Sequence, residues 1–390
     1  MGRRVALWLT SAAVVVVGFV ACTDQRPEAG SVTPVLVSGG GLSTENSARR
    51  CAWERLPTPK LDAIVESDLN AVVVASPTAA WAVGHRTDPF QAFSLRWNGQ
   101  SWADERLAQR GKIELKGVAA VSSRQAWAVG EEIDANVNHR SVVLRWKDGR
   151  WSRIAAPDDS TRDDFMFQTP LQDVVAFGPD NAWAGGSLLS HWNGRRWSVA
   201  RNVVHESILD LDGSSPDNVW AVGGNAARRP FVLHWNGTRW SKIKTPHTPL
   251  PDAEVESVAA LRPNDVWISG YSAAREGSND PRWRPFLMHW NGSRWSVNER
   301  TSARVGAESV MLARSTQDIW YYGDKALAHW NGRSWHVSRP SVLYGSGSER
   351  FFLKVTALSA APGSSLWAVG YEMREYPKPT RAFVARRICR

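Results

Sequence analysis

Residues 255–299 read VESVAALRPNDVWISGYSAAREGSNDPRWRPFLMHWNGSRWSVNE, and this stretch predicts four short strands joined by tight turns. The first predicted strand is 255–261, and a Pro-Asn-Asp turn signal leads from it into the second, 266–270. The third covers 285–290, an Asn-Gly pair then makes a tight hairpin of the primed type, and the fourth covers 295–299. β-Branched and aromatic residues dominate these segments, which favours strands over helices.

Two motifs of this stretch recur along the chain and alternate strictly. Trp-x-x-Gly occurs seven times, 37 to 56 residues apart, at Trp81, Trp127, Trp183, Trp220, Trp267, Trp320 and Trp367. Trp-Asn-Gly-x-x-Trp, with Lys-Asp in place of Asn in one copy, starts at Trp97, Trp146, Trp192, Trp235, Trp290 and Trp330. A period of this length with four strands per unit is typical of a β-propeller. We therefore predict an all-β fold: a seven-bladed β-propeller of four-stranded antiparallel blades over residues 51–390.

The seventh repeat ends at 382–390 without a fourth strand, and the missing strand is found at the other end of the propeller region. Residues 51–59 align with 238–246 of the fourth repeat, so the N- and C-terminal strands are expected to pair in one blade and close the ring. In this alignment Cys51 and Cys389 are neighbours at the position of the absent hairpin. In an exported protein such a pair predicts a disulfide.

The N-terminus carries an export signal. Residues 5–21 are uncharged and apolar and follow Arg3 and Arg4, which predicts a signal peptide over 1–21. Phe19-Val20-Ala21-Cys22 resembles the lipobox of bacterial lipoproteins, which implies that Cys22 is lipidated; the alternative is a plain signal peptide cleaved near Ala21. Residues 22–50 are rich in Gly, Ser, Thr and Pro and form the expected flexible tether. The expected location is a bacterial membrane surface that faces the periplasm or the cell exterior.

The repeats resemble those of bacterial exported propellers built from WAVG and WNGxxW motifs, many of which are lipoproteins. Their Gly-x-x-Trp hairpins also resemble the end of the Asp-box of sialidase-like propellers, Ser-x-Asp-x-Gly-x-x-Trp. In the fourth repeat Leu233 and Trp235 stand at the Ser and Asp positions of that box. The resemblance therefore implies the fold and does not imply sialidase activity. We interpret the repeat tryptophans as spacers that fill the gaps between blades.

The connections between the second and third strands, and between successive blades, vary in length and are expected on one face of the ring. Binding residues concentrate on such loops. The variable segments are 131–141, 152–171, 271–285, 336–352 and 371–382. One of them holds Arg282, Trp283 and Arg284, in which Trp283 falls outside both motifs, so we predict a binding site at these three residues. The alternative is a loop that folds back on its own blade.

Acidic residues recur near the start of the first strand in four successive blades: Asp173, Asp210, Glu256 and Glu308. These side chains are expected at the mouth of the central channel, where they would form a hydrated acidic funnel. A Ca²⁺ ion bound by them is the alternative. No other cofactor is expected.

A basic residue precedes the first hairpin tryptophan, or its equivalent, in every blade: Arg96, Arg145, His191, His234, His289, His329 and Arg386. Equivalent positions in different blades are too far apart to share one metal ion, so no metal site is expected there. Cation–π contact or cross-strand packing on a neighbouring tryptophan is the expected role.

No motif in the chain carries a recognisable reaction. A phosphate-binding loop, the HExxH zinc spacing and the G-x-S-x-G elbow are all missing, so no catalytic residue is assigned. The formal charge is +9, and removal of Arg3 and Arg4 with the signal leaves 45 basic against 38 acidic residues, or +7. The bases are spread over all blades, which permits an anionic polymer but makes nucleic acid an unexpected partner.

We therefore expect a monomeric, membrane-tethered binding or scaffold protein whose loop-rich face holds an envelope protein or glycan. The alternative function is an envelope carbohydrate-active enzyme, a glycoside hydrolase or lyase, that uses acids at the channel mouth.

Overall fold

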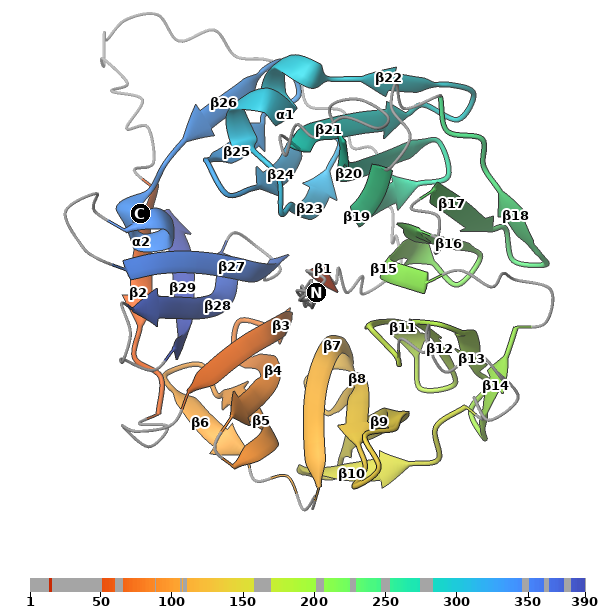
Figure 1. Ribbon diagram of the computed structural model, residues 1–390, viewed down its shortest axis with the longest axis vertical. Helices are drawn as coiled ribbons and strands as arrows, with labels where there is room; N and C mark the ends of the chain where they lie inside the picture. Colours follow the sequence, from red (N-terminus) through yellow and green to blue (C-terminus); the bar gives the residue numbers. More distant parts are fainter. Residues whose placement is uncertain are drawn as a thin grey trace, which may run out of the picture.

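The computed structural model describes residues 14–15, 51–59, 66–87, 89–105, 107, 111–157, 170–200, 207–224, 229–246, 253–273, 283–345, 351–360, 365–374 and 380–389. The described strands form seven antiparallel sheets arranged as blades around a central axis (Figure 1). The predicted seven-bladed propeller is therefore confirmed. None of the helices among the described residues is long and apolar enough to cross a membrane.

Blades 1 to 4 follow one another along the chain, each with its first strand innermost (Figure 1). Blade 1 contains β3 (Ser67–Ser76), β4 (Ala79–Thr87), β5 (Phe90–Trp97) and β6 (Trp102–Glu105). Blade 2 contains β7 (Lys112–Ser122), β8 (Gln125–Ile133), β9 (His139–Lys147) and β10 (Arg150–Ile154). Blade 3 contains β11 (Asp173–Gly178), β12 (Asn181–Gly185), β13 (Leu189–Trp192) and β14 (Trp197–Val199). Blade 4 contains β15 (Ser207–Ser215), β16 (Asn218–Gly224), β17 (Pro230–Trp235) and β18 (Trp240–Lys242).

Blades 5 to 7 include two short helices. Blade 5 contains β19 (Ala253–Arg262), β20 (Asp265–Ala273), β21 (Trp283–Trp290) and β22 (Trp295–Val297), followed by α1 (Glu299–Val305). Blade 6 contains β23 (Val310–Ser315), β24 (Asp318–Tyr322), β25 (Leu327–Trp330) and β26 (Trp335–Ser338), followed by α2 (Ser341–Tyr344). Blade 7 contains β27 (Phe351–Ala360), β28 (Leu366–Arg374), β29 (Arg381–Cys389) and, as its outer strand, β2 (Cys51–Leu56). The two residues of β1 (Val14–Val15) pair in parallel with β27 at the centre of the ring (Figure 1).

The ring closes in blade 7 as the sequence predicts. Strand β2 pairs antiparallel with β29, and Cys51 lies directly opposite Cys389 in the register. Their side chains form a disulfide that joins residues separated by 338 positions. Arg386 reinforces the pairing because its guanidinium donates to a Glu54 carboxylate oxygen over 2.9 Å. The predicted disulfide and strand pairing are therefore both confirmed.

The glycine of Trp-x-x-Gly is required by a close approach of two strands. In five blades the innermost strand shifts register opposite this glycine, as happens between Leu69 and Ala71 opposite Gly84. A Cβ atom on Gly84 would collide with the backbone carbonyl oxygen of Asp68. The glycine therefore lets the innermost strand bulge, and a side chain at this position would force the two strands apart.

The Trp-Asn-Gly-x-x-Trp hairpins pair their two tryptophans across the outer two strands, as Trp290 pairs with Trp295. The hairpin glycine has a positive φ in all six copies, between 78° and 100°. The Asn291 side-chain oxygen accepts from the backbone N–H groups of Ser293 and Arg294 at 3.1 and 3.0 Å. Glycine thus permits the turn, and asparagine binds the turn amides that the hairpin leaves unpaired.

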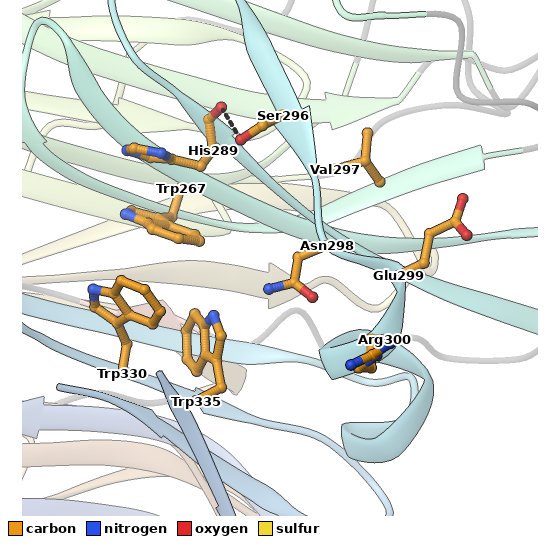
Figure 2. Close-up of a pocket in the computed structure, with 9 residues that line it drawn as sticks. All are labelled: Trp267, His289, Ser296, Val297, Asn298, Glu299, Arg300, Trp330 and Trp335. Carbon is orange, nitrogen blue, oxygen red and sulfur yellow. Dashed lines mark hydrogen bonds between the residues drawn. The ribbon is translucent and has the colours of Figure 1, made fainter. Parts of the chain in front are cut away.

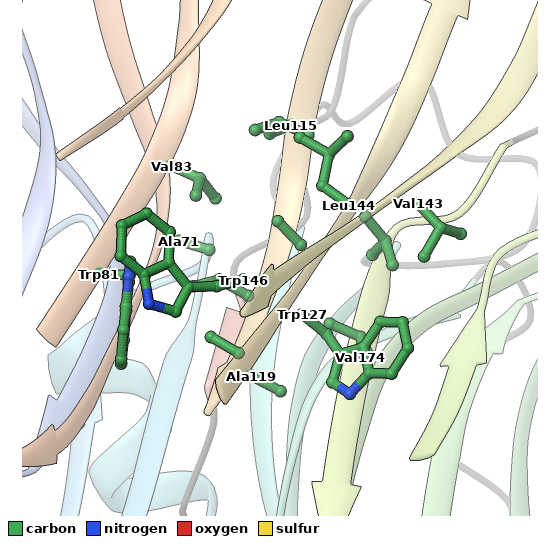
Figure 3. Packing of buried hydrophobic residues seen from close by; sticks show 14 of the residues in the cluster. Ala71, Trp81, Val83, Leu115, Ala119, Trp127, Val143, Leu144, Trp146 and Val174 are labelled. Carbon is green, nitrogen blue, oxygen red and sulfur yellow. The ribbon is translucent and has the colours of Figure 1, made fainter. Parts of the chain in front are cut away.

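Tryptophans from adjacent blades meet in the spaces between them. Trp127 of blade 2 lies 5.0 and 5.4 Å, between ring centroids, from Trp192 and Trp197 of blade 3. Trp81 of blade 1 meets Trp146 of blade 2 at 5.9 Å in the same way (Figure 3). The sheets themselves contribute smaller apolar side chains that face each other across the gap, including Ala71, Val83, Leu115, Ala119 and Val174 (Figure 3). The tryptophans are thus the spacers that the repeats predict.

The predicted strand and loop limits need correction around blade 5. The fourth strand ends at Val297 instead of residue 299, because Asn298 caps α1 by accepting a hydrogen bond from the Thr301 N–H. The predicted loop 271–285 is also too long, because β20 continues to Ala273 and β21 begins at Trp283. Paired strands therefore occupy both ends of a segment whose polar composition suggests a loop.

Candidate functional site

The two faces of the propeller differ in their connections. The turns between the first two strands of a blade and the tryptophan hairpins lie on one face, here called the turn face. The connections between the second and third strands, and between successive blades, lie on the opposite face, here called the loop face. The innermost strands and β21 begin at the loop face, so the candidate channel acids and Arg284 map to that end of the blades.

The acids expected at the channel mouth hold neighbouring blades together. Asp173 of blade 3 accepts from the Leu211 N–H of blade 4 at 2.9 Å, and Asp210 of blade 4 accepts from the Val258 N–H of blade 5 at 2.8 Å. Both carboxyls are fully buried. Because the innermost strand of each blade has an unpaired edge, these carboxyls satisfy amides that would otherwise lack partners. Asp173 and Asp210 are therefore not part of a hydrated funnel, which corrects that expectation.

The other two acids lie at the same end of the neighbouring blades. Glu256 of blade 5 accepts from the N–H and the hydroxyl of Ser309 in blade 6, at 3.0 and 3.1 Å. Burial raises the pKa of Glu256 to about 7. Glu308 is half-exposed, and its carboxylate oxygen lies 3.4 Å from Nζ of Lys354 in blade 7. Within the part of the chain that the structure describes, no three His, Cys, Asp or Glu side chains are grouped closely enough to hold a metal ion.

Asp173 and Asp210 also form a carboxyl pair with each other. Burial raises the pKa of Asp173 to about 7, and burial together with the charge of Asp173 raises the pKa of Asp210 well above its usual value. The pair is connected by a hydrogen bond that lowers the pKa of Asp173 and raises that of Asp210. Asp210 is thus the donor in this hydrogen bond, and Asp173 is the acceptor.

This pair predicts a pH-dependent stability that Asp210→Asn should weaken. When the pKa of a carboxyl is higher in the folded than in the unfolded protein, its contribution to stability is complete below the unfolded pKa, near 3.8. That contribution is lost as the pH rises through the pKa of the folded protein. Asparagine in place of Asp210 does not titrate, so it removes this contribution to the pH dependence. Urea unfolding at pH 5 and pH 8 should therefore show a smaller loss of stability for Asp210→Asn than for the wild type.

Asp212 is a third buried carboxyl at this end of the blades, and burial raises its pKa to about 8. Its two oxygens accept from the Gly213 and Ala260 N–H groups at 2.8 and 2.7 Å. An amide nitrogen in place of one oxygen would face a backbone N–H, so Asp212→Asn should destabilise the protein at both pH values by about 1–3 kcal/mol and should also lose less stability than the wild type between pH 5 and pH 8. A variant of either residue that loses as much stability as the wild type over this pH range would contradict the raised pKa values.

The sequence gives no indication of a polar cluster at the loop-face ends of blades 1 and 2. Glu131 binds Lys116 Nζ at 2.7 Å and His139 Nδ1 at 2.5 Å. Burial would raise the pKa of Glu131, but Lys116 and His139 outweigh it and lower that pKa. Burial raises the pKa of Asp68, whose carboxylate accepts from the Thr380 hydroxyl at 3.0 Å. The predicted strands account for the positions of Glu131, Lys116 and Asp68. Thr380, however, reaches Asp68 only because the ring closes between blades 7 and 1.

Arg282–Arg284 lies only partly within the described residues. Arg282 lies outside them, as does the Trp283 side chain, while the Trp283 backbone begins β21 and Arg284 is exposed. The prediction for these three residues remains a prediction. A second feature of the loop face, which the sequence does not signal, is an exposed apolar pair in blade 7: Phe352 and Met373 lie opposite each other on β27 and β28 and are 46% and 39% exposed.

The basic residue before the hairpin tryptophan takes one of two positions on the rim. In blades 7, 1 and 2 it is arginine, which covers the hairpin tryptophan of the next blade; in blades 7 and 2 the guanidinium also lies over the tryptophan of its own blade. The distances from Cζ to the ring centroid are 5.6 Å for Arg386 and Trp97, 5.3 Å for Arg96 and Trp146, and 5.7 Å for Arg145 and Trp192. These contacts confirm the predicted cation–π role in these three blades.

In blades 3 to 6 the residue is histidine, which stacks on the tryptophan of its own blade. The ring-centroid distances are 4.4 Å for His191 and Trp183, 4.3 Å for His234 and Trp220, 4.2 Å for His289 and Trp267, and 4.1 Å for His329 and Trp320. Each Nε2 lies within 3.1 Å of a side-chain oxygen two residues before that tryptophan, from Asn181, Asn218, Asp265 or Asp318. The arginine blades have Ala79, Gln125 or Ser365 at that position, which leaves the basic side chain free to extend.

This difference divides the rim into a covered part and an open part. Hairpin tryptophans that follow an arginine blade are only 2–6% exposed: Trp97, Trp102, Trp146, Trp151, Trp192 and Trp197. Those that follow a histidine blade are partly exposed: Trp235, Trp240, Trp290, Trp295, Trp330 and Trp335. A histidine that stacks on its own blade cannot reach the next one, so the aromatic surface beside it stays accessible.

Comparison with solved structures finds other propellers. The fold resembles that of YCF48. YCF48 bound to a D1 peptide matches with a TM-score of 0.55 at 16% identity, over 86% of this chain and 96% of that chain. YCF48 from Cyanidioschyzon merolae matches with a TM-score of 0.52 at 15% identity, over 86% of this chain and 98% of that one. No protein-family model matches the sequence, and no curated protein matches it.

A third match is the extracellular domain of the one-component system BT4673 from B. thetaiotaomicron, with a TM-score of 0.55 at 11% identity. The match covers 86% of this chain but only 40% of that chain. At identities this low the likeness concerns the fold alone, and function has to be argued from the residues of this chain.

Proposed function

We propose that this chain is a binding or scaffold protein, tethered to a bacterial membrane through Cys22 and exported to the periplasmic or outer side, where its loop face holds a protein or glycan partner. The proposal rests on one contrast within the described part of the loop face. Acidic side chains there are already engaged by neighbouring groups, while two large apolar side chains, Phe352 and Met373, are exposed to solvent.

The acids of the loop face are poorly suited to catalysis. A glycoside hydrolase uses two carboxyls on either side of an open substrate site. Asp173 and Asp210 are buried, and Glu131 is bound by Lys116 and His139. Glu372 is likewise occupied, because Arg55 donates to it at 2.9 Å. These contacts support a binding role over the enzymatic alternative.

The exposed pair supports contact with a partner. Contact of large apolar side chains with water is unfavourable, and complete burial of one of this size contributes about 1.5–3 kcal/mol. Because Phe352 and Met373 are 46% and 39% exposed, a partner that covers them gains a part of that free energy from each. Arg284 is exposed on the same face and can add a charged contact. The propeller YCF48, to which this fold is similar, has been solved with a D1 peptide bound, which provides a precedent for a peptide partner on such a scaffold.

Site-specific photo-crosslinking in intact cells tests the proposal. A crosslinking residue in place of Met373 should give a defined product in the membrane fraction, and one in place of Arg239 on the turn face should not.

Trp283→Ala should reduce the product by weakening binding by about 1–3 kcal/mol, with unchanged thermal stability. Cys22→Ala should move the protein and its product to the soluble fraction. Equal amounts of crosslinked product from both positions, or no product from position 373, would contradict partner binding at the loop face.

A further inference from the structure

A pocket of about 360 Å³ opens on the rim between blades 5 and 6. Trp267 and His289 of blade 5 and Trp330 and Trp335 of blade 6 form one side (Figure 2). The other side is the segment Ser296–Arg300, which leaves β22 and enters α1 (Figure 2). The segment Ser296–Arg300 enters the connection from blade 5 to blade 6, but the described residues that line the pocket do not include Arg284, Phe352 or Met373, so the pocket's function does not depend on the partner proposed above.

The aromatic side of the pocket is open because blade 5 carries histidine. His289 stacks on Trp267 and is held there by Asp265 at 2.8 Å, so it does not extend over Trp330. In blade 2 the equivalent Arg145 covers Trp192 and reaches the Pro179 carbonyl oxygen of the next blade. The repeat thus shows what fills this space when it is closed, and the same space beside Trp330 and Trp335 is free for a ligand.

The aromatic surface has a defined arrangement. Trp335 meets Trp267 edge-on at 5.6 Å, and Figure 2 shows its nitrogen edge turned toward the Trp267 ring. Trp330 is fixed because its Nε1 donates to the Thr316 carbonyl oxygen over 3.1 Å. Both blade 6 indoles are therefore held in place while remaining partly exposed, and a ligand does not have to order them on binding.

The opposite side of the pocket supplies hydrogen-bond donors. Asn298 uses its side-chain oxygen to cap α1, and Figure 2 shows its amide nitrogen directed toward the tryptophans. Glu299 and Arg300 are exposed at the pocket mouth, and Figure 2 shows the Glu299 carboxylate turned away from the tryptophans. The pocket therefore offers N–H donors from Asn298 and Arg300 opposite flat apolar surfaces.

We infer that this pocket binds a single ring of a saccharide. A pyranose has an apolar C–H face that fits an indole and a rim of hydroxyls that both donate and accept hydrogen bonds. Trp330 and Trp335 match the first property, and the N–H groups of Asn298 and Arg300 can donate to the hydroxyl oxygens. An arginine side chain from a partner would bring only donors and would meet the charge of Arg300, and a purely apolar side chain would leave the polar groups without partners.

The test closes the pocket by introducing the residues that occupy the equivalent positions of blade 2. The double variant Asp265→Gln with His289→Arg copies the Gln125 and Arg145 pair of blade 2, and it should place a guanidinium over Trp330. Full-length wild-type protein should bind at least one saccharide on an array of neutral, N-acetylated and acidic glycans. Calorimetry with the strongest of these should show at least a tenfold weaker affinity for the double variant. Arg300→Ala should weaken binding about tenfold, as expected for loss of a charged hydrogen bond.

Two controls separate this pocket from the closed part of the rim and from the loop face. Gln125→Ala, at the equivalent position of blade 2, should leave saccharide binding unchanged. Trp283→Ala should also leave it unchanged, which distinguishes the rim pocket from the proposed loop-face site. Absence of binding to every glycan on the array, unchanged affinity in both the double variant and Arg300→Ala, or binding of an arginine-containing peptide in place of a saccharide would each overturn the inference.

Discussion

Trp127→Ala is expected to lower the free energy of unfolding by about 3–5 kcal/mol, the usual loss when a fully buried large aromatic side chain is truncated. The Trp127 ring is inaccessible to solvent and packs between Trp192 and Trp197 of the next blade. The guanidinium carbon of Arg145 lies 5.1 Å from its centroid. Two hydrogen-bonded sheets form the walls of the resulting cavity, and such sheets cannot move together enough to fill it.

Trp235→Ala is the control for this prediction. Trp235 follows a histidine blade, so its ring is partly exposed and part of its surface remains in contact with water when the protein is folded. Its loss should therefore be clearly smaller than that of Trp127. Urea denaturation of both variants with equal m-values measures the difference. Equal losses of stability would show that the burial provided by the covering arginine does not stabilise the fold.

Replacing both Cys51 and Cys389 with serine is expected to cost up to about 5 kcal/mol of stability. A disulfide restricts the unfolded chain in proportion to the logarithm of the loop it closes, and this one joins residues 338 apart, so its effect on the unfolded state is near the upper limit. Within the fold, the link also fixes the outer strand of blade 7, which is only six residues long.

Urea denaturation of the oxidised wild type and of the serine variant measures this loss. Hydrogen exchange of β2 and β29 locates it, because the outer strand of blade 7 should open before the other blades when the disulfide is absent. Reduced wild type should behave like the variant. A variant as stable as the wild type, with β2 still protected, would show that strand pairing alone closes the ring.

The repeat periodicity was sufficient to predict the blades because it reports two local requirements. The Trp-x-x-Gly glycine is fixed by a backbone collision, as at Gly84, and the hairpin glycine by a positive φ, as at Gly292. Requirements of this kind are met within one blade, so they leave the same residue at the same place in each copy. The alignment of Cys51 with Cys389 follows from the same register.

The repeats did not predict the surroundings of the acids at the channel mouth. Asp173 and Asp210 stand where a channel-mouth residue is expected, but their partners are amides of the neighbouring blade. Which amide comes within reach depends on the rotation between blades, which is not a property of one repeat. The sequence therefore located these residues but predicted the wrong environment for them.

The open part of the rim was visible in the sequence only as a change from arginine in blades 7, 1 and 2 to histidine in blades 3 to 6. Its meaning depends on the distance between one blade and the next, which decides whether a side chain at position 145 or 289 reaches across. A local signal did exist for α1, since Asn298 and Glu299 are a typical helix start after a strand. That signal would have identified the polar side of the pocket.

The disulfide also determines how the propeller bears mechanical load. Cys51 is the first residue of β2, so any tension applied through the preceding chain enters the propeller at the disulfide. The sulfur–sulfur bond transmits that force directly to Cys389 and so into β29, which is paired along its length with β28. The hydrogen bonds of β2 then carry almost none of it. We expect the disulfide-bonded ring to withstand pulling from its N-terminal side by covalent bonds at the point where an outer strand would otherwise be the first to detach.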